Sequence, residues 1–300
     1  MKKFFNTIYQ KTYFYLFPST SHHKADYPTY QTRVNDISIN YAKIGKGPNL
    51  VFVHGWTNNW EGWIPIVKYL EKDFTLYLVD MPGFGDSGNL PCYSVNTCAD
   101  YIVAFIEKLH LRPEAVVGVS MGSFVVADIG SRYPQITKDC ILTGCVVRDG
   151  HLRVLTEACD LLLRTVRHSS LAETVLKKII ETKMAAYFLA KYMNMYRFDK
   201  EMVDKYGMIG KKKIRKVAYV EIGISAASYK LKDTLKKMKI PTLLVLGEND
   251  KYTDYRYVAK NIIPHNELLK LVAVEEAGHV VPWEKPKEVA ESINTFLSSR

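Results

Sequence analysis

The sequence predicts an α/β fold in which a mostly parallel central sheet has helices on both faces and a helical cap is inserted into the chain. Short apolar runs, each followed by a segment of helical periodicity, predict alternating buried strands and helices. These runs lie in residues 49–53, 74–79, 115–117, 139–147 and 241–247. Strands that are apolar along their whole length are typical of a parallel sheet covered on both faces. Residues 150–240 interrupt the alternation, because they are rich in helix formers, lysines, tyrosines and methionines and contain no strong buried strand.

This pattern divides the chain into four parts. Residues 1–25 are an N-terminal extension, 26–149 the first part of the core, 150–240 the cap and 241–300 the second part of the core. Residues on both sides of Asn35-Asp36 predict a hairpin of two strands, and residues 288–299 predict a closing helix. A chain of 300 residues with 47% hydrophobic residues is long enough to bury one large core.

Positive charge is concentrated in the cap and near the N-terminus. Residues 151–240 carry 20 basic and 9 acidic side chains, and residues 1–50 carry 7 and 2, whereas the rest of the chain has a net charge of −6. No nucleic-acid-binding module accompanies this charge, so we expect no nucleic-acid partner but a basic surface that faces solvent or an anionic membrane. The first 17 residues include seven aromatic side chains, which predict an interfacial helix or a helix packed on its own domain.

The five cysteines are odd in number and lack the spacing of a metal site (Cys92, Cys98, Cys140, Cys145 and Cys159). Cys140 and Cys145 lie in an apolar stretch, which predicts buried thiols. No apolar run approaches the ~20 residues of a membrane span. We therefore expect a cytoplasmic protein, either free or peripheral at a membrane surface.

Ser120 lies in the sequence GVSMG, between an apolar strand that ends near Gly118 and a helix that begins beyond Gly122. A turn sharp enough to join them lifts the serine hydroxyl clear of the sheet and requires glycine two residues to either side. This arrangement suits a nucleophile. The alternative is a serine that caps the helix next to two unrelated glycines, and the pentapeptide alone does not separate the two interpretations.

An acid and a base follow Ser120 in the order that a catalytic triad on such a sheet requires. Asp250 ends the strand in LLVLGEND, and His279 follows the short apolar run LLKLVAV. The carboxyl ends of parallel strands meet at one edge of a sheet, so we expect the three side chains to lie together. An imidazole activates a serine by taking its proton, and a carboxylate holds that imidazole in the right tautomer. Asp149 and Asp254 are alternative acids, since each lies near a strand end.

A fourth element, His54-Gly55-Trp56, follows an early strand. From there the backbone N–H of Trp56 can join that of Met121 in an oxyanion hole, in which losing one donor typically costs ~3 kcal/mol of transition-state stabilisation. His54 itself is expected to organise the loop by hydrogen bonds rather than to act in catalysis.

Five segments match the landmarks of a known family in order: HGW, DMPGFGDSG, GVSMG, LGEND and AGHVVPWEKP. From about residue 28 to its end, the chain resembles the α/β-hydrolase superfamily, in the subgroup with a helical cap between two halves of the core. The resemblance implies the α/β-hydrolase fold, with Ser120 as nucleophile, Asp250 as acid and His279 as base. It also implies an oxyanion hole formed by Trp56 and Met121.

Two positions depart from the family pattern and leave the subfamily open. Val119 stands where many relatives have a polar residue, and Ser123 replaces a frequent glycine. A serine at position 120 sets the chain apart from haloalkane dehalogenases and epoxide hydrolases, which resemble it but use a carboxylate there.

We expect a serine carboxylesterase, lipase-like, that cleaves esters of an apolar or acyl substrate through an acyl-enzyme intermediate. There are two alternatives. The first is another enzyme on the same triad: a thioesterase, a C–C bond hydrolase or a cofactor-free perhydrolase. The second is a non-enzymatic ligand receptor. Trp60, Phe84 and Trp283 are candidates for lining the substrate pocket, although each on its own could equally belong to the core. The chemistry needs no metal and no organic cofactor. The sequence leaves the oligomeric state open.

Overall fold

The structure is a computed structural model that describes residues 27–147 and 153–299. The described residues form an eight-stranded sheet in the order β1-β2-β4-β3-β5-β6-β7-β8. Its strands are β1 Thr29–Val34, β2 Ile37–Gly45, β3 Asn49–Val53, β4 Thr75–Val79, β5 Pro113–Val119, β6 Asp139–Thr143, β7 Thr242–Gly247 and β8 Leu269–Val274. β2 runs antiparallel to β1 and β4, and all other neighbours are parallel. This confirms the predicted α/β fold with a mostly parallel sheet.

The hairpin β1–β2 turns at Asn35-Asp36, as the sequence predicts. Asn35 has a φ of 50°, a left-handed conformation that asparagine tolerates better than most residues do. β3 to β7 are almost entirely buried, which is why their sequences are apolar at nearly every position.

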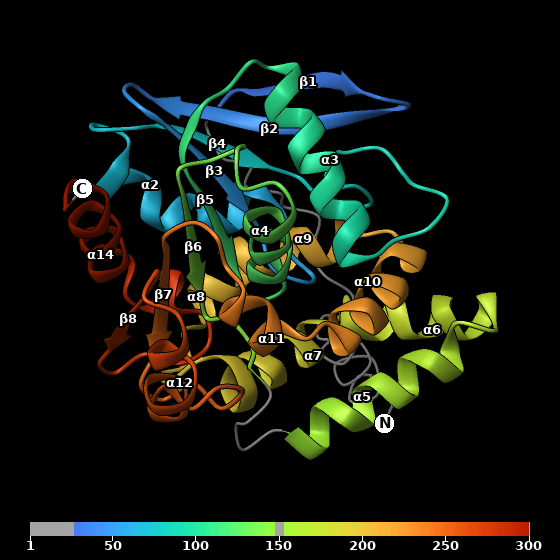
Figure 1. Cartoon of the computed structure of the whole chain (residues 1–300). Helices are drawn as coiled ribbons and strands as arrows, with labels where there is room; N and C mark the ends of the chain where they lie inside the picture. Colours follow the sequence, from blue (N-terminus) through green and yellow to red (C-terminus); the bar gives the residue numbers. More distant parts are fainter. Residues whose placement is uncertain (1–26, 148–152, 300) are drawn as a thin grey trace, which may run out of the picture.

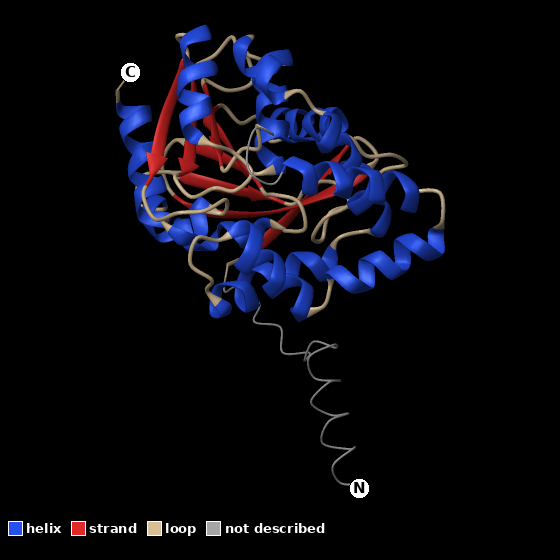
Figure 2. Cartoon of the chain, turned by 90° about the horizontal axis from the view of Figure 1, so that it is seen from below, coloured by secondary structure: helices blue, strands red, loops and turns tan. Residues whose placement is uncertain are grey.

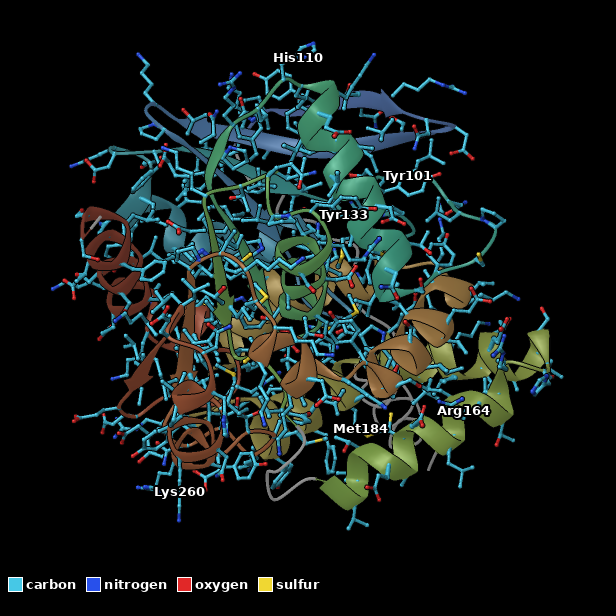
Figure 3. All side chains as sticks on the ribbon, viewed as in Figure 1. Tyr101, His110, Tyr133, Arg164, Met184 and Lys260 are labelled. Atoms are coloured by element: carbon cyan, nitrogen blue, oxygen red, sulfur yellow. The ribbon has the colours of Figure 1, made fainter. Side chains whose placement is uncertain are left out.

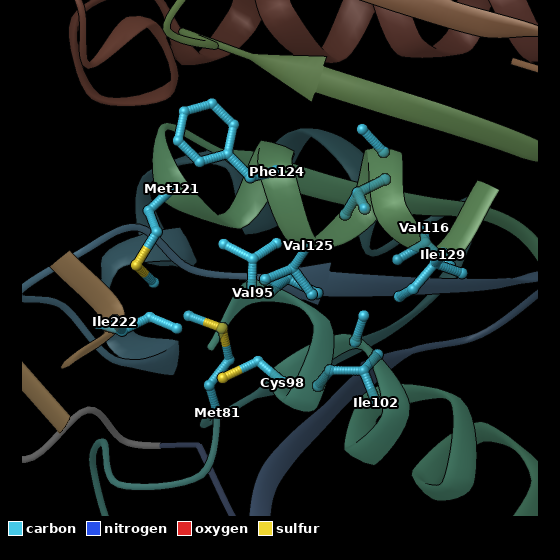
Figure 4. Packing of buried hydrophobic residues seen from close by; sticks show 14 of the residues in the cluster. Met81, Val95, Cys98, Ile102, Val116, Met121, Phe124, Val125, Ile129 and Ile222 are labelled. Atoms are coloured by element: carbon cyan, nitrogen blue, oxygen red, sulfur yellow. The ribbon is translucent and has the colours of Figure 1, made fainter. Parts of the chain in front are cut away.

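Helices lie on both sides of the sheet (Figures 1 and 2). Successive residues of a strand point to opposite faces, so Leu50 and Phe52 of β3 join one core cluster and Val51 and Val53 join the other. The first cluster packs under α2 Ile64–Leu70, α13 Val281–Glu284 and α14 Pro286–Ser298. The second packs under α3 Val95–Lys108, α4 Met121–Arg132 and α12 Tyr255–Asn261. Figure 4 shows α3 side chains meeting α4 side chains there, Val95 beside Val125 for example.

Between β6 and β7 the described residues form helices only. These are α5 Arg153–Val166, α6 Ser170–Ile180, α7 Lys183–Leu189, η2 Ala190–Asn194, α8 Lys200–Met202, η3 Val203–Gly207, α9 Met208–Lys213, α10 Lys216–Ser228 and α11 Leu231–Lys236. The short helices η1 Trp60–Trp63 and η4 Ile263–His265 complete the described elements. In Figure 1, α5, α6 and α7 lie at the end of the molecule opposite the β1–β2 hairpin.

Two expectations fall on residues that the structure does not describe: the helix in residues 1–25 and the alternative acid Asp149. Cys140 and Cys145 are fully buried, as predicted. None of the described helices is both long enough and apolar enough to cross a membrane.

Candidate active site

Ser120 stands at a sharp turn between β5 and α4. Its φ of 54° lies in a left-handed region that costs a non-glycine residue of order 1–3 kcal/mol and persists only where the surroundings enforce it. A Cβ at Gly118 would lie 2.4 Å from the Gly122 carbonyl oxygen, and a Cβ at Gly122 would lie 2.3 Å from that of Val53, so both positions require glycine. The Ser120 side chain makes no capping bond to α4. The alternative of a serine that caps the helix is therefore wrong.

The structure brings Ser120, His279 and Asp250 into one hydrogen-bonded chain. His279 Nε2 lies 2.8 Å from Ser120 Oγ, and His279 Nδ1 lies 2.9 Å from Asp250 Oδ2. A carboxylate only accepts, so Nδ1 carries the ring proton and Nε2 accepts from the serine hydroxyl. His279 and Asp250 are buried, which limits competition from water for these bonds. The arrangement can pass a proton from the serine to the imidazole.

The loop that carries His279 is held by the helices that precede β7 and by a carboxylate. The His279 N–H donates to the carbonyl oxygen of Asn194, 2.7 Å away at the end of η2. Glu284 accepts the Gly278 N–H at 2.8 Å and the Tyr196 N–H at 2.7 Å. No motif marks Asn194, and Glu284 lies within AGHVVPWEKP without a role that the sequence assigns to it.

The two backbone N–H groups expected in the oxyanion hole lie beside Ser120. Met121 follows it as the first residue of α4, and the Gly55-Trp56 loop comes so close that a Cβ on Gly55 would lie 3.4 Å from the Ser120 Cβ. Neither N–H finds a backbone acceptor among the described residues. The Trp56 ring is fixed, because its Nε1–H donates to the Tyr219 carbonyl oxygen at 3.1 Å and the ring stacks on that of Tyr219. Trp56 and Met121 both line the cavity next to Ser120.

His54 organises this loop, as expected from the sequence. Its Nε2 lies 3.1 Å from the Met81 N–H and can only accept there, so Nδ1 carries the proton and donates to the Gly55 carbonyl oxygen at 2.9 Å. Burial lowers the pKa of His54 to about 4, which keeps the ring neutral.

A buried carboxylate that the sequence analysis missed fixes the neighbouring loops. Asp80 accepts the Trp60 N–H at 2.8 Å, the Asp86 N–H at 2.9 Å and an Asn40 amide N–H at 2.8 Å. Burial raises the pKa of Asp80 to about 6, although these donors favour its charged form. Asp80 thus holds together the segments that lead into η1 and out of β4.

A cavity of about 480 Å³ opens beside Ser120 and His279. Its lining is mainly apolar and includes Trp56, Met121 and Trp283. The Trp283 Nε1–H donates to the Gly62 carbonyl oxygen at 2.7 Å, which fixes the ring at the cavity wall. A space of this size and composition suits an acyl chain.

Trp60 and Phe84 do not line this cavity, which corrects the expectation from the sequence. Trp60 is 2% exposed and packs in the core cluster beneath α2. Phe84 is fully buried, with its ring 5.1 Å from that of His54. Asp80 accepts the N–H of Trp60 and that of Asp86, two residues after Phe84, so both aromatic residues lie in segments that are bonded to this buried carboxylate.

Comparison with known proteins places the chain in a family. A family model described as alpha/beta hydrolase fold matches residues 48–286. The chain belongs to the alpha/beta hydrolase family. It is therefore classed as a hydrolase, with a fold that the sequence motifs identified correctly.

Curated relatives of this alpha/beta hydrolase include two enzymes of different specificity. Monoacylglycerol lipase ABHD6 of Homo sapiens is 25% identical over 266 residues, which cover 85% of this chain and 77% of that protein. Pyrrolizixenacetamide deacetylase of Xenorhabdus hominickii is 24% identical over 289 residues, covering 90% and 98%. Among solved structures, a thermophilic esterase from Thermogutta terrifontis has a TM-score of 0.71 at 18% identity and covers 92% of this chain and 99% of that one. That last similarity is one of fold.

The two departures from the family pattern have clear local roles. The Ser123 hydroxyl lies 3.1 Å from the Gly118 carbonyl oxygen and 3.2 Å from that of Thr143 and shares its one hydrogen between them, which ties the turn to the sheet. Val119 lines the cavity with an apolar side chain. Asp254, the alternative acid, caps α12 by accepting the Arg256 N–H at 2.9 Å and takes no part in the hydrogen-bonded chain.

No group of three or more His, Cys, Asp or Glu side chains in residues 27–147 and 153–299 is placed to hold a metal ion.

Proposed function

We propose that this alpha/beta hydrolase is a serine esterase, lipase-like, that cleaves the ester of an apolar acyl substrate through an acyl-enzyme. The observation that carries the proposal is the chain Ser120–His279–Asp250, with distances of 2.8 and 2.9 Å, at the wall of an apolar cavity. A lipase and a deacetylase among the relatives both act on acyl groups by their names, which supports acyl transfer as the reaction class.

In the proposed reaction, Ser120 Oγ attacks the ester carbonyl while His279 Nε2 takes its proton. Asp250 stabilises the imidazolium that forms, and the N–H groups of Trp56 and Met121 donate to the developing oxyanion. His279 then returns the proton to the leaving alcohol, and water releases the acyl group by the same steps in reverse order. Residues 150–240 act as a cap over the substrate, and residues 26–149 and 241–300 form the core.

The test of this function is labelling with a fluorophosphonate, followed by hydrolysis of p-nitrophenyl esters of increasing acyl length. We expect one label per chain, on Ser120, and rates that rise with acyl length until the chain fills the cavity. Matched thioesters and amides in the same assay separate an esterase from the other enzymes that the triad could support. A protein that takes no label and hydrolyses none of the panel would instead be a ligand receptor.

We further propose that the enzyme works at an anionic membrane surface. Apart from Tyr30, the exposed large apolar side chains among the described residues all lie between residues 154 and 198. The side chains in this stretch are Val154, Leu155, Leu161, Leu162, Leu171, Val175, Ile179, Met184, Phe188, Tyr192, Tyr196 and Phe198. Leu155 and Phe188 also line the cavity, so this surface and the cavity meet. Figure 3 labels Arg164 on α5 and Met184 on α7, two of the helices that combine basic and exposed apolar side chains.

The membrane proposal predicts salt-sensitive binding to vesicles. Each basic residue near an anionic surface contributes up to ~1 kcal/mol, so we expect co-sedimentation with anionic but not neutral vesicles, and its loss at high salt. Replacing both Leu161 and Leu171 by Ser should weaken vesicle binding several-fold, because both side chains are well exposed. Neither residue lines the cavity, so the change leaves the cavity wall intact. Tyr30→Ser is the matched control, and a variant lacking residues 1–25 measures the share of the N-terminal extension. Equal partitioning under all conditions would contradict the proposal.

A further inference from the structure

Lys211 of α9 is a buried cation in the wall of the substrate cavity. Its side chain lines the cavity, and the residue is only 7% exposed. The next two lysines of the same helix differ: Lys212 and Lys213 are partly exposed, and Lys213 pairs with Asp86 at 2.6 Å. A lysine kept inside the protein while its neighbours reach solvent is unusual, since lysine is almost never fully buried without a partner.

The Lys211 ammonium has no carboxylate partner among the described residues. Within residues 27–147 and 153–299 the ammonium donates to one side chain, Thr57 Oγ1 at 3.1 Å, which leaves two of its three N–H donors without an acceptor there. Glu181 does not neutralise the Lys211 ammonium, because it is paired with Lys177. The Lys177 ammonium also donates to the carbonyl oxygens of Lys211 and Lys212. Asp160, which also lines the cavity, accepts from Arg164 at 3.1 Å.

Burial lowers the pKa of Lys211 to about 8, and no neighbouring charge opposes the effect. The side chain is therefore still mostly charged at pH 7. An unpaired charge inside a protein destabilises the fold, and a methionine of similar length would fill the same space without that cost.

The backbone places Lys211 close to the oxyanion loop. α9 packs so tightly on this loop that a Cβ on Gly210 would lie 2.4 Å from the Asn58 Cα. The lysine consequently meets Thr57, the residue directly after Trp56. A group bound by the ammonium would lie beside Thr57, next in the chain to Trp56, in the cavity that Ser120 also lines.

We propose that Lys211 binds an anionic oxygen group of the substrate, a carboxylate or a phosphate, so that the enzyme prefers acyl esters that carry such a group near the ester bond. The inference rests on the proposed esterase function for its substrate, while binding of the anion can be measured without turnover. The apolar wall takes the acyl chain, and Lys211 selects the group that is attached to it. Neutral esters still fit but leave the buried charge unpaired.

The test is equilibrium binding of three amphiphiles with one chain length, decanoate, decyl phosphate and decanol, at concentrations where each is monomeric. We expect both anions, or the one whose geometry fits, to bind at least ~10-fold more tightly than decanol. Lys211→Met should weaken anion binding by about 100-fold and leave decanol unchanged, because a charged partner is lost only for the anions. Lys205→Met, which removes an exposed lysine from η3, is the matched control and should bind all three like the parent.

Two further readouts separate this role from a structural one. Decanoate binding by the parent should weaken as the pH rises from 7 to 9.5, because Lys211 loses its proton near pH 8, whereas Lys211→Met should show no such change. Lys211→Met should also raise Tm by a few degrees at pH 7. Folding lowers the pKa of this lysine, so the unfolded chain binds more protons than the folded protein between pH 8 and 10.5. The stability of the parent therefore rises through that window, and the Tm difference between the parent and Lys211→Met should shrink.

Equal loss of decanol and anion binding in Lys211→Met, with a lower Tm, would overturn the proposal and make Lys211 a support for the Thr57 loop. Equal affinity of the parent for all three amphiphiles would also overturn it. Failure of the esterase function appears elsewhere, as a lack of fluorophosphonate labelling, and leaves the binding measurements intact.

Discussion

Ser120→Ala is expected to lower kcat for a p-nitrophenyl acyl ester by about 10⁶-fold, to the level that binding and the oxyanion hole sustain alone. The loss is large because the triad acts as a unit: without Oγ, the pair His279–Asp250 has no nucleophile to activate. The fold should persist, since the Ser120 side chain makes no bond to the helix that it precedes. Steady-state kinetics and thermal unfolding of the same preparation measure both effects.

Ser123→Ala is the matched control, because it removes a hydroxyl three residues away on the same turn. This hydroxyl shares its one hydrogen between two carbonyl oxygens of the sheet, so its loss should reduce the free energy of unfolding by about 1 kcal/mol and leave kcat nearly unchanged. The reverse pattern, with Ser123→Ala inactive and Ser120→Ala fully active, would end the serine-hydrolase proposal.

Much of the fold could be predicted because burial in a parallel sheet leaves a direct trace in the sequence. β3, β4 and β7 are apolar at nearly every position, and only a strand covered on both faces needs that. The turn at Ser120 could also be predicted from the sequence. Gly118 and Gly122 mark it, because backbone atoms leave no room for a Cβ at either position.

Trp60 and Phe84 show where this reasoning stops. Both stand in the sequence near expected site loops, yet whether an aromatic ring faces a cavity or the core depends on how the loop folds back. Here the decisive contacts come from Asp80, a carboxylate whose partners lie up to 40 residues away in the chain. Contacts between residues so far apart in the chain leave no periodic pattern in the local sequence, so the sequence does not reveal them.

The sequence does not predict the buried position of Lys211 for a related reason. It is the first of three consecutive lysines, and a run of charge ordinarily marks a solvated face. The helical turn sends the three side chains in different directions, and the missing side chain of Gly210 lets α9 approach the oxyanion loop at that one place. The net charge along the chain therefore gave no sign that Lys211 lines the cavity.

Asp250→Asn is expected to lower kcat by about 10⁴-fold with little change in fold. Both carboxylate oxygens of Asp250 accept: Oδ1 from the Tyr252 N–H at 2.8 Å and Oδ2 from His279 Nδ1. An asparagine has one acceptor and one donor end, so if its oxygen keeps the Tyr252 bond, its NH₂ group faces Nδ1. The imidazole must then carry its proton on Nε2, where it cannot accept the proton of Ser120.

The matched control for this change is Asp254→Asn, the same substitution four residues further on. Asp254 caps α12, and asparagine caps a helix about as well as aspartate, so kcat and Tm should both stay near the parent values. Measuring kcat for the two variants on one ester decides between the two carboxylates as the acid. If Asp250→Asn kept most of its activity while Asp254→Asn lost it, the hydrogen bond between His279 and Asp250 would be structural, and the assignment of Asp250 as the acid would be wrong.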